Sequence, residues 1–347
     1  MASRTAIKRL VLLGPVPPPY GGVQTHMMAL RARAIARGMD VHVLNLTRHR
    51  TADLPNVLHP QSPWELLRHV RALRPDVLHL HAGGVLSNRI VALLGALTLI
   101  AKAPVHFTFH SGGFPTSVAG RKLSSATVTA IILRRLARVI GVNAELTDFF
   151  ERLGVSTQRV SMLRPDSPIV VDRSAASNAL QDFARRASPF LLSVGGMEPV
   201  YQVSQQIRAM NEIAKRWPGV GMLIVGSGSE LAARQAEAAA SPNAQQLLLP
   251  GDVPHVGVLA LMSVADAVLR PTAYDGDAIS VREALQLGRS VVATRTAFRP
   301  AGVHLIDSVE PQHMVDGIAL ALNGRNDFAT VGTSDWSAID AIIDGYT

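Results

Sequence analysis

Residues 267–294 read AVLRPTAYDGDAISVREALQLGRSVVAT. A short apolar strand, Ala267–Leu269, leads into a loop of small and polar residues, and a helix-length segment, Ile279–Leu287, follows. A second apolar strand, Val291–Ala293, completes the stretch. This order is typical of a right-handed βαβ unit with two parallel strands.

The same alternation extends from this unit to both ends of the chain. In the first half it predicts strands at 10–13, 41–46, 77–81, 105–110, 138–142 and 160–163, with helices at 23–37, 87–102, 121–136 and 144–153. In the second half it predicts further strands at 190–194, 222–225 and 247–249, with helices at 203–217, from about 230, and at 256–263. The fold class is therefore α/β, with parallel sheets.

A chain of 347 residues exceeds the size of one ordinary hydrophobic core, so two domains are expected. The alternation is interrupted at residues 164–188 by prolines and small polar residues, and the linker is placed there. We predict an N-terminal domain at 1–166, a C-terminal domain at 167–330, and a last helix at 331–347 that crosses back to the first domain.

Charge is distributed unevenly. The net charge is +8, but residues 1–166 carry 21 basic and 8 acidic residues, whereas residues 167–347 carry 13 and 18. A basic first half indicates an anionic partner, which could be a membrane surface, a phosphorylated acceptor or nucleic acid. An arginine-rich composition without a partner is the alternative, since four of the 34 basic residues are lysines.

The composition excludes several classes. Hydrophobic residues make up 48%, which excludes a disordered chain, and the absence of cysteine excludes disulfides and thiolate metal sites. The apolar run after Arg9 is too short for a signal peptide, and the run at 90–101 is too short to span a bilayer. We expect a cytoplasmic protein, peripheral on the inner face of the cytoplasmic membrane.

The loop at 270–285 carries the clearest chemistry. Asp275 precedes Glu283 by eight positions, and the segment between them is rich in small residues. Loop amides and a helix N-terminus can hold a diphosphate, while two carboxylates accept hydrogen bonds from sugar hydroxyls. The sequence Asp275-Gly276-Asp277 also fits an Asp-x-Asp metal motif, but the following helix explains the loop better, and no metal is expected there.

Two glycine loops also follow predicted strands. Gly21 and Gly22 precede a helix, where the backbone can approach an anion closely, and Gly226 and Gly228 form a turn against which a nucleoside can lie. Each pattern is also compatible with a purely structural turn.

Two neighbouring predicted strands carry four histidines, which are His79, His81, His106 and His110. His79 and His81 share a strand face and could chelate a metal, but no carboxylate nearby in sequence completes a site, and no metal site is predicted. His110, before Ser111 and two glycines, is a candidate for hydrogen bonding a polar substrate; a structural histidine is the alternative.

Taken together, these loops resemble the GT-B-fold retaining glycosyltransferases of family 4. The acid-x7-acid loop, the Tyr20-Gly21-Gly22 turn, His110, and the glycine turns occur in the family's order and spacing over nearly the whole chain. The resemblance implies two Rossmann-like domains facing each other across a cleft. It also implies a nucleotide-sugar donor, a glycan, lipid-linked or small-molecule acceptor, no cofactor, and no nucleic acid.

The resemblance also assigns roles to residues. It implies that Asp275 meets the hydroxyls of the donor sugar, Glu283 those of the ribose, and His110 the transferred sugar. The donor is further implied to contact the backbone and small side chains of Gly21, Gly22, Gly195, Gly226, Gly228, Asp252, Val253, Gly276, Asp277, Ala278, Ile279 and Ser280.

Two departures from the family pattern stand out. Gly196 and Tyr201 occupy the positions of an Arg and a Lys that usually neutralise the diphosphate, and Asp275 replaces a glutamate. A leaving diphosphate needs its developing charge stabilised. The candidate replacement cations are Arg270, Arg282 and Arg299.

Glycosyl transfer is the leading hypothesis for the function. A nucleotide-sugar epimerase of the same fold and a catalytically silent nucleotide-sugar-binding protein remain alternatives, the second because of the missing cations. Nicotinamide-dependent oxidoreduction is disfavoured, since the first strand is not followed by the fingerprint glycine loop.

Overall fold

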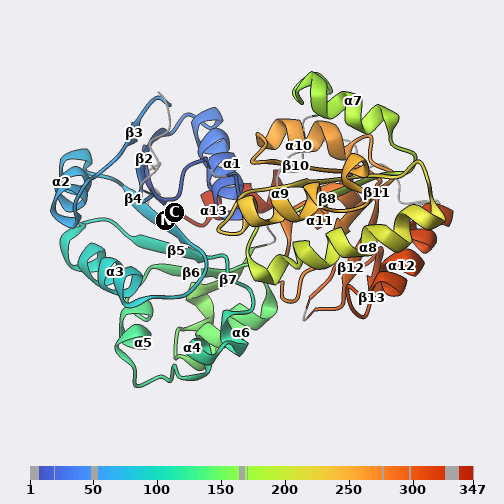
Figure 1. Ribbon diagram of the computed structural model, residues 1–347. Helices are drawn as coiled ribbons and strands as arrows, with labels where there is room; N and C mark the ends of the chain where they lie inside the picture. Colours follow the sequence, from blue (N-terminus) through green and yellow to red (C-terminus); the bar gives the residue numbers. More distant parts are fainter. Residues whose placement is uncertain are drawn as a thin grey trace. The chain divides into compact units, whose positions relative to one another are not determined.

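The computed structural model describes residues 8–18, 20–47, 54–163, 169, 171–275, 277–296, 298–324 and 336–346. The chain divides into two compact units. Unit 1 contains residues 1–18, 22–167 and 335–347, and unit 2 contains residues 19–21 and 168–334. Each unit holds a parallel sheet with helices on both faces (Figure 1). The predicted fold class of two α/β parallel-sheet domains is confirmed.

The sheet of unit 1 has seven strands in the described part of the chain, in the order β3-β2-β1-β4-β5-β6-β7. The strands are β1 Arg9–Gly14, β2 Asp40–Asn45, β3 Val57–Leu58, β4 Val77–Ala82, β5 Val105–Phe109, β6 Arg138–Gly141 and β7 Val160–Met162. Because β1 pairs with both β2 and β4, the strand order changes direction between β1 and β4. Ligands of open parallel sheets bind beyond the carboxyl ends of strands at such a point.

Helices cover both faces of the unit 1 sheet. They are α1 Gly22–Ala36, α2 Pro63–Leu73, α3 Asn88–Ile100, α4 Val118–Arg121, α5 Val128–Leu133, α6 Ala144–Arg152 and α13 Ser337–Asp344, with short 3-10 turns at Phe114–Thr116 and Thr157–Arg159. One buried cluster joins α2, α3, α5 and α6 to the sheet, and a second joins α1 and α13 to its other face. Strands buried on both faces explain why the sequence reads as continuous apolar runs.

The last helix, α13, packs within unit 1. Arg33 of α1 donates two hydrogen bonds to the Asp340 carboxylate, at 2.8 and 2.6 Å. Ile339, Ile342 and Ile343 are buried in the cluster that contains α1. The chain end is therefore part of the unit that contains the chain start.

Unit 2 repeats the architecture with six strands among the described residues, in the order β10-β9-β8-β11-β12-β13. The strands are β8 Phe190–Val194, β9 Gly221–Val225, β10 Leu247–Gly251, β11 Ala267–Arg270, β12 Ser290–Thr294 and β13 Val303–Ile306. Its helices are α7 Asn178–Arg186, α8 Val203–Arg216, α9 Leu231–Ala239, α10 His255–Met262, α11 Ile279–Gln286 and α12 Pro311–Asn323, with 3-10 turns at Pro199–Tyr201 and Ala244–Gln246. Helices α8, α9 and α12 pack on one face, and α7, α10 and α11 on the other.

The predicted helix at 121–136 is wrong as one continuous element. The structure has two short helices, α4 and α5, separated by residues 122–127. Thr127 caps the start of α5 by accepting a hydrogen bond at Oγ1 from the Ala130 amide. Ser and Thr side chains compete with helical backbone bonding, which explains the interruption.

Three further helices depart from the sequence prediction, and one of them, α12, was not predicted at all. Helix α7 lies inside the predicted linker. Its Leu180 and Phe183 side chains are buried in the core cluster on one face of the unit 2 sheet. Helix α2 was not predicted either, although Ser62, Pro63 and Glu65 form a clear start signal. Ser62 Oγ accepts from the Glu65 amide at 3.1 Å, and the Glu65 carboxylate accepts from the Gln61 amide at 2.6 Å.

Within the described residues, every helix is too short or too polar to cross a membrane.

Candidate functional site

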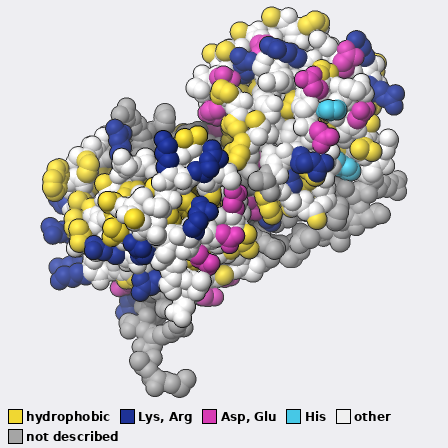
Figure 2. All heavy atoms as spheres, turned by 90° about the horizontal axis from the view of Figure 1, so that it is seen from below, with side chains coloured by type: hydrophobic (Ala, Val, Ile, Leu, Met, Phe, Trp, Pro, Cys, Tyr) yellow, Lys and Arg dark blue, Asp and Glu magenta, His cyan; other side chains and the backbone are white. Residues whose placement is uncertain are grey.

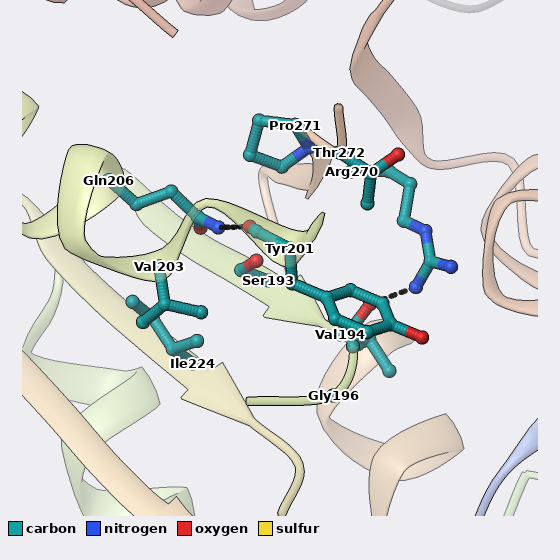
Figure 3. A pocket seen from close by; sticks show the side chains of 11 residues that line it. Ser193, Val194, Gly196, Tyr201, Val203, Gln206, Ile224, Arg270, Pro271 and Thr272 are labelled. Atoms are coloured by element: carbon teal, nitrogen blue, oxygen red, sulfur yellow. Dashed lines mark hydrogen bonds between the residues drawn. The ribbon is translucent and has the colours of Figure 1, made fainter. Parts of the chain in front are cut away.

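The strand order of unit 2 changes direction between β8 and β11, which pair in parallel. A small cavity lies at the carboxyl ends of these two strands (Figure 3). Its lining includes residues 193–196 at the end of β8, residues 270–272 at the end of β11, and Tyr201. The loop singled out in the sequence therefore begins at the place where a ligand is expected.

Tyr201 and Arg270 fill the space beside Gly195 and Gly196. A Cβ atom built on Gly195 or Gly196 would stand 2.6 or 2.7 Å from ring carbons of Tyr201. The Arg270 guanidinium lies over the same ring, 5.1 Å from its centroid, and donates from Nη1 to the Val194 carbonyl at 2.7 Å (Figure 3). A cation from β11 thus lies next to Gly195, which precedes the position where the resemblance implies an arginine.

Asp275 is held by two arginines. Arg270 Nε donates to Asp275 Oδ2 at 2.8 Å, and Arg299 Nη1 donates to the same oxygen at 2.7 Å. Burial alone would raise the pKa of Asp275, but the charges and hydrogen bonds of Arg270 and Arg299 outweigh it and lower the pKa to about 2. The three side chains are nearly buried, and together they carry a net charge of about +1.

Arg299 is further anchored by backbone and hydroxyl acceptors. Its Nε donates to the Thr294 carbonyl at 3.1 Å, and its Nη2 donates to Thr272 Oγ1 at 3.1 Å. These contacts join the end of β12 to the loop after β11. Two of the three predicted replacement cations, Arg270 and Arg299, therefore form one cluster with Asp275.

Arg282, the third candidate cation, makes a different pair. It donates from Nε and Nη2 to the two carboxylate oxygens of Asp277, at 2.7 and 2.6 Å. Ala278 precedes α11, which begins with Ile279 and Ser280, and no side chain caps this helix start within the described residues. Gly276, also predicted to line the donor, lies outside the described residues.

Glu283 lies on the second turn of α11 with 3% of its surface exposed. Its Oε1 lies 2.6 Å from Nε2 of His255, the first residue of α10. Burial alone would lower the pKa of His255, but the hydrogen bond and charge of Glu283 outweigh it and raise the pKa. The structure thus pairs the predicted ribose-binding carboxylate with a histidine that the sequence analysis did not single out.

The remaining predicted donor residues lie at neighbouring strand ends. Gly226 follows β9 with φ of 141°, and a Cβ there would stand 1.6 Å from the Gly195 carbonyl oxygen. A Cβ on Gly228 would stand 2.7 Å from the Met197 amide nitrogen. These glycines permit close packing of two loops. After β10, Asp252 is exposed and Val253 is buried.

In unit 1, His110 lies at the carboxyl end of β5. Its amide donates to the Ala82 carbonyl at 2.8 Å, and its Nε2 lies 3.2 Å from Nδ1 of His81. His26 of α1 packs edge-on against His110, with ring centroids 5.2 Å apart. Burial, with a smaller effect from His26, lowers the pKa of His110 well below its ordinary value.

His79 has a structural environment. Its Nδ1 lies 2.6 Å from the hydroxyl of Tyr346, and its Nε2 lies 2.7 Å from Thr108 Oγ1. Both ring nitrogens are therefore occupied by partners inside unit 1. Of the predicted turn glycines, Gly22 is the first residue of α1, and Gly21 is grouped with unit 2.

Comparisons with known proteins identify the family. Residues 181–329 match the family described as glycosyl transferases group 1, and residues 20–165 match glycosyltransferase family 4. The two matches together span most of the chain. It belongs to the GT-B glycosyltransferases of group 1.

Individual relatives agree with this assignment. The glycosyltransferase is 26% identical over 283 residues to a phosphatidyl-myo-inositol mannosyltransferase of Mycobacterium tuberculosis, covering 76% of this chain and 71% of that protein. Its fold matches Anabaena HepE, solved in complex with UDP-glucose, with a TM-score of 0.68, 12% identity, and 96% and 98% of the two chains covered.

The fold is also shared with an enzyme of another activity. A UDP-GlcNAc 2-epimerase of Methanocaldococcus jannaschii matches with a TM-score of 0.64 and 12% identity, covering 97% of this chain and 99% of that one. The fold alone therefore does not distinguish the two activities. The family matches and the mannosyltransferase relative support transfer.

The glycosyltransferase also contains functional candidates that sequence reasoning missed. His255 lies two positions after the predicted Asp252-Val253 turn, behind Pro254, and begins a helix, which was an available signal. His26 carried no such signal, because it lies on a helix face 55 positions from His81. Only the packing of α1 on the sheet brings it to His81 and His110.

Proposed function

We propose that this glycosyltransferase moves a sugar, with retention of configuration, from a nucleoside-diphosphate sugar to a lipid-linked acceptor at the inner face of an anionic membrane. In this proposal unit 2 binds the donor and unit 1 receives the acceptor. HepE, a structural neighbour, was solved with UDP-glucose, and a relative is named as a mannosyltransferase of a phosphatidylinositol. Both names support the substrate classes proposed here.

The observation that carries the donor assignment is the pair of carboxylates around the start of α11. Asp275 lies in the loop at the cavity, and Glu283 lies one to two turns into the helix. The start of α11 has no side-chain cap, so its first amides are available to a phosphate. We assign the diphosphate to this helix start and the ribose hydroxyls to Glu283, which His255 orients at 2.6 Å.

Arg270 is proposed as the cation that replaces the missing family residues. Transfer leaves a nucleoside diphosphate whose developing charge needs a positive group. Arg270 lies beside Gly195 and over Tyr201, and Arg299 shares its carboxylate partner, so the cluster keeps about one positive charge. Arg282 makes a two-point contact with Asp277 instead, which favours a local role. Donor chemistry in this scheme needs no metal.

A screen of nucleotide sugars tests the function. Purified protein is incubated with UDP- and GDP-sugars, with and without lipid-linked acceptors, and nucleoside diphosphate release is measured. Acceptor-dependent release is expected. Binding of a nucleotide sugar without transfer to any acceptor would instead favour a silent binding protein, the second candidate, which the replacements at Gly196 and Tyr201 motivate.

The membrane part of the proposal rests on a surface of unit 1. Helices α3, α4 and α5 carry exposed apolar side chains. These are Leu99, Val118, Val128 and Ile131, with exposed fractions of 77, 65, 67 and 41%. Arg121, Lys122, Arg134 and Arg135 are exposed on the same elements or directly after them. Hydrophobic side chains bordered by basic ones are visible in Figure 2. Such a surface suits anionic headgroups.

Liposome co-sedimentation tests this surface. Each basic residue near anionic headgroups contributes about 1 kcal/mol, so an Arg134→Ala/Arg135→Ala double variant should bind roughly 30-fold more weakly. Binding should require anionic lipid and weaken in high salt. The matched control is Arg185→Ala/Arg186→Ala on α7 of unit 2, which should bind like wild type. Equal binding to neutral liposomes, or loss in both double variants, would contradict the proposal.

A further inference from the structure

Three histidines from separate elements meet at the carboxyl ends of the unit 1 strands. His26 lies on α1, His81 is near the end of β4, and His110 follows β5. One ring nitrogen of each lies within 4.8 Å of the others. The cluster lies where the strand order changes direction between β1 and β4, which is where open parallel sheets bind ligands.

Three ring nitrogens of this cluster have no hydrogen-bond partner in the described part of the chain, whereas His81 Nδ1 and His110 Nε2 lie 3.2 Å from each other. Both nitrogens of His26 and Nε2 of His81 have no hydrogen-bond partner among the described residues, although His26 and His81 have 0 and 1% of their surfaces exposed. A buried polar group without a partner costs about 1–3 kcal/mol. His79, two residues from His81 on the same strand, has a partner at each nitrogen. The two unpartnered nitrogens of His26 therefore indicate capacity for a ligand beside the His81–His110 pair.

The chemistry of three imidazoles selects the ligand. Zinc binds histidine nitrogen at about 2.0–2.1 Å in tetrahedral geometry, which separates neighbouring nitrogens by roughly 3.3 Å. His81 Nδ1 and His110 Nε2 are 3.2 Å apart, close to this separation, and a ring nitrogen of His26 lies within 4.8 Å of both histidines. Imidazole suits Zn, Cu and Ni, whereas Mg and Ca prefer oxygen.

We propose that His26, His81 and His110 bind one transition-metal ion, with zinc as the reference ion, and leave its fourth position open. Burial keeps the imidazoles neutral by lowering the pKa of His26 to about 4 and the pKa of His81 well below its ordinary value. Neutral imidazole is the metal-binding form, and it does not attract anions as a charged cluster would. A bound ion occupies His110 and so withdraws it from the sugar, a role that His110 has under the proposed function.

Calorimetric titration of metal-free protein with Zn²⁺ tests the site. One ion per chain is expected, with loss of binding in both His26→Gln and His81→Gln. The control is His69→Gln, which removes a histidine on α2 whose Nε2 lies 3.6 Å from Glu65 and which could bind zinc adventitiously at the surface. This variant should bind like wild type. Binding lost in His69→Gln but kept in the other two would overturn the proposal, as would no binding at all.

A spectroscopic measurement on wild-type protein covers the case in which a variant does not fold. Co²⁺ at the three-histidine site should give the intense visible absorption of a four-coordinate ion, and Zn²⁺ should displace it. Weak absorption typical of six-coordinate cobalt would overturn the proposal. Zn²⁺ should also inhibit transfer. Binding without inhibition would leave the metal site intact and contradict only the role given to His110.

Discussion

Asp275 offers a sharp test of whether the loop after β11 is organised by its ion pairs. Substituting Asp275→Asn keeps the shape of the side chain but removes the negative charge between Arg270 and Arg299. Both arginines then remain nearly buried with one charged partner fewer, since their side chains are 12 and 4% exposed. Breaking a buried pair in this way destabilises a protein by about 3–5 kcal/mol.

A second value follows from the pKa of Asp275. Its pKa falls from 3.8 to about 2 on folding, and at about 1.4 kcal/mol per pH unit this difference corresponds to roughly 2.5 kcal/mol. Because the folded pKa is lowered, this stability is present above pH 3.8 and is lost as the pH falls through about 2. We therefore expect Asp275→Asn to lower the free energy of unfolding by about 2–5 kcal/mol at pH 7.

Urea unfolding of the whole chain, followed at the transition of unit 2 and at constant ionic strength, measures the difference in unfolding free energy between wild type and Asp275→Asn. The control is Asp307→Asn, the same substitution in an exposed ion pair. The side chains of Arg295 and Asp307 in this pair are 64 and 76% exposed. It should change stability by less than about 0.5 kcal/mol. The Asp275→Asn difference should shrink as the pH approaches 2. An Asp275→Asn variant as stable as Asp307→Asn at pH 7 would refute the reasoning.

Three more predictions concern individual residues. Because Glu283 raises the pKa of His255, this pair's contribution to stability is complete below about pH 6.5 and is lost as the pH rises through the raised value. The unfolding free energies of wild type and His255→Ala should therefore converge at alkaline pH. A difference that grows with pH would contradict the pairing with Glu283. Arg270→Ala should lower turnover about 10²-fold or more, with partial recovery in Arg270→Lys, whereas unchanged turnover would exclude it as the replacing cation. His110→Ala should lower turnover about tenfold while calorimetric binding of the bare nucleoside diphosphate stays nearly intact, and equal loss of both would contradict its role at the sugar.

Patterns of neighbouring residues in the sequence were sufficient to predict most of the fold. Apolar strands buried on both faces and helix-length segments are recorded directly in the order of residues, and so is the acid-x7-acid spacing of Asp275 and Glu283. The break between α4 and α5 was also readable, since Thr127 and the serines before it favour caps over helix interiors.

Side-chain contacts between residues that lie far apart in the sequence could not be predicted from it. Arg299 meets Asp275 across 24 positions, and His255 meets Glu283 across 28. Each contact depends on how neighbouring strands and helices pack. His26 likewise reaches His81 and His110 only through the packing of α1. The sequence could therefore name Arg270 and Arg299 as candidate cations, but it could not give them a shared carboxylate.

Donor binding by Glu283→Gln tests the central claim most directly. Calorimetric titration of wild-type protein with UDP- and GDP-sugars should identify a donor, and Glu283→Gln should bind that donor about 1–3 kcal/mol more weakly, which is about 5- to 150-fold. Asp307→Asn should bind it like wild type. Unchanged affinity in a folded Glu283→Gln variant would contradict the account of unit 2 as the nucleotide-sugar site.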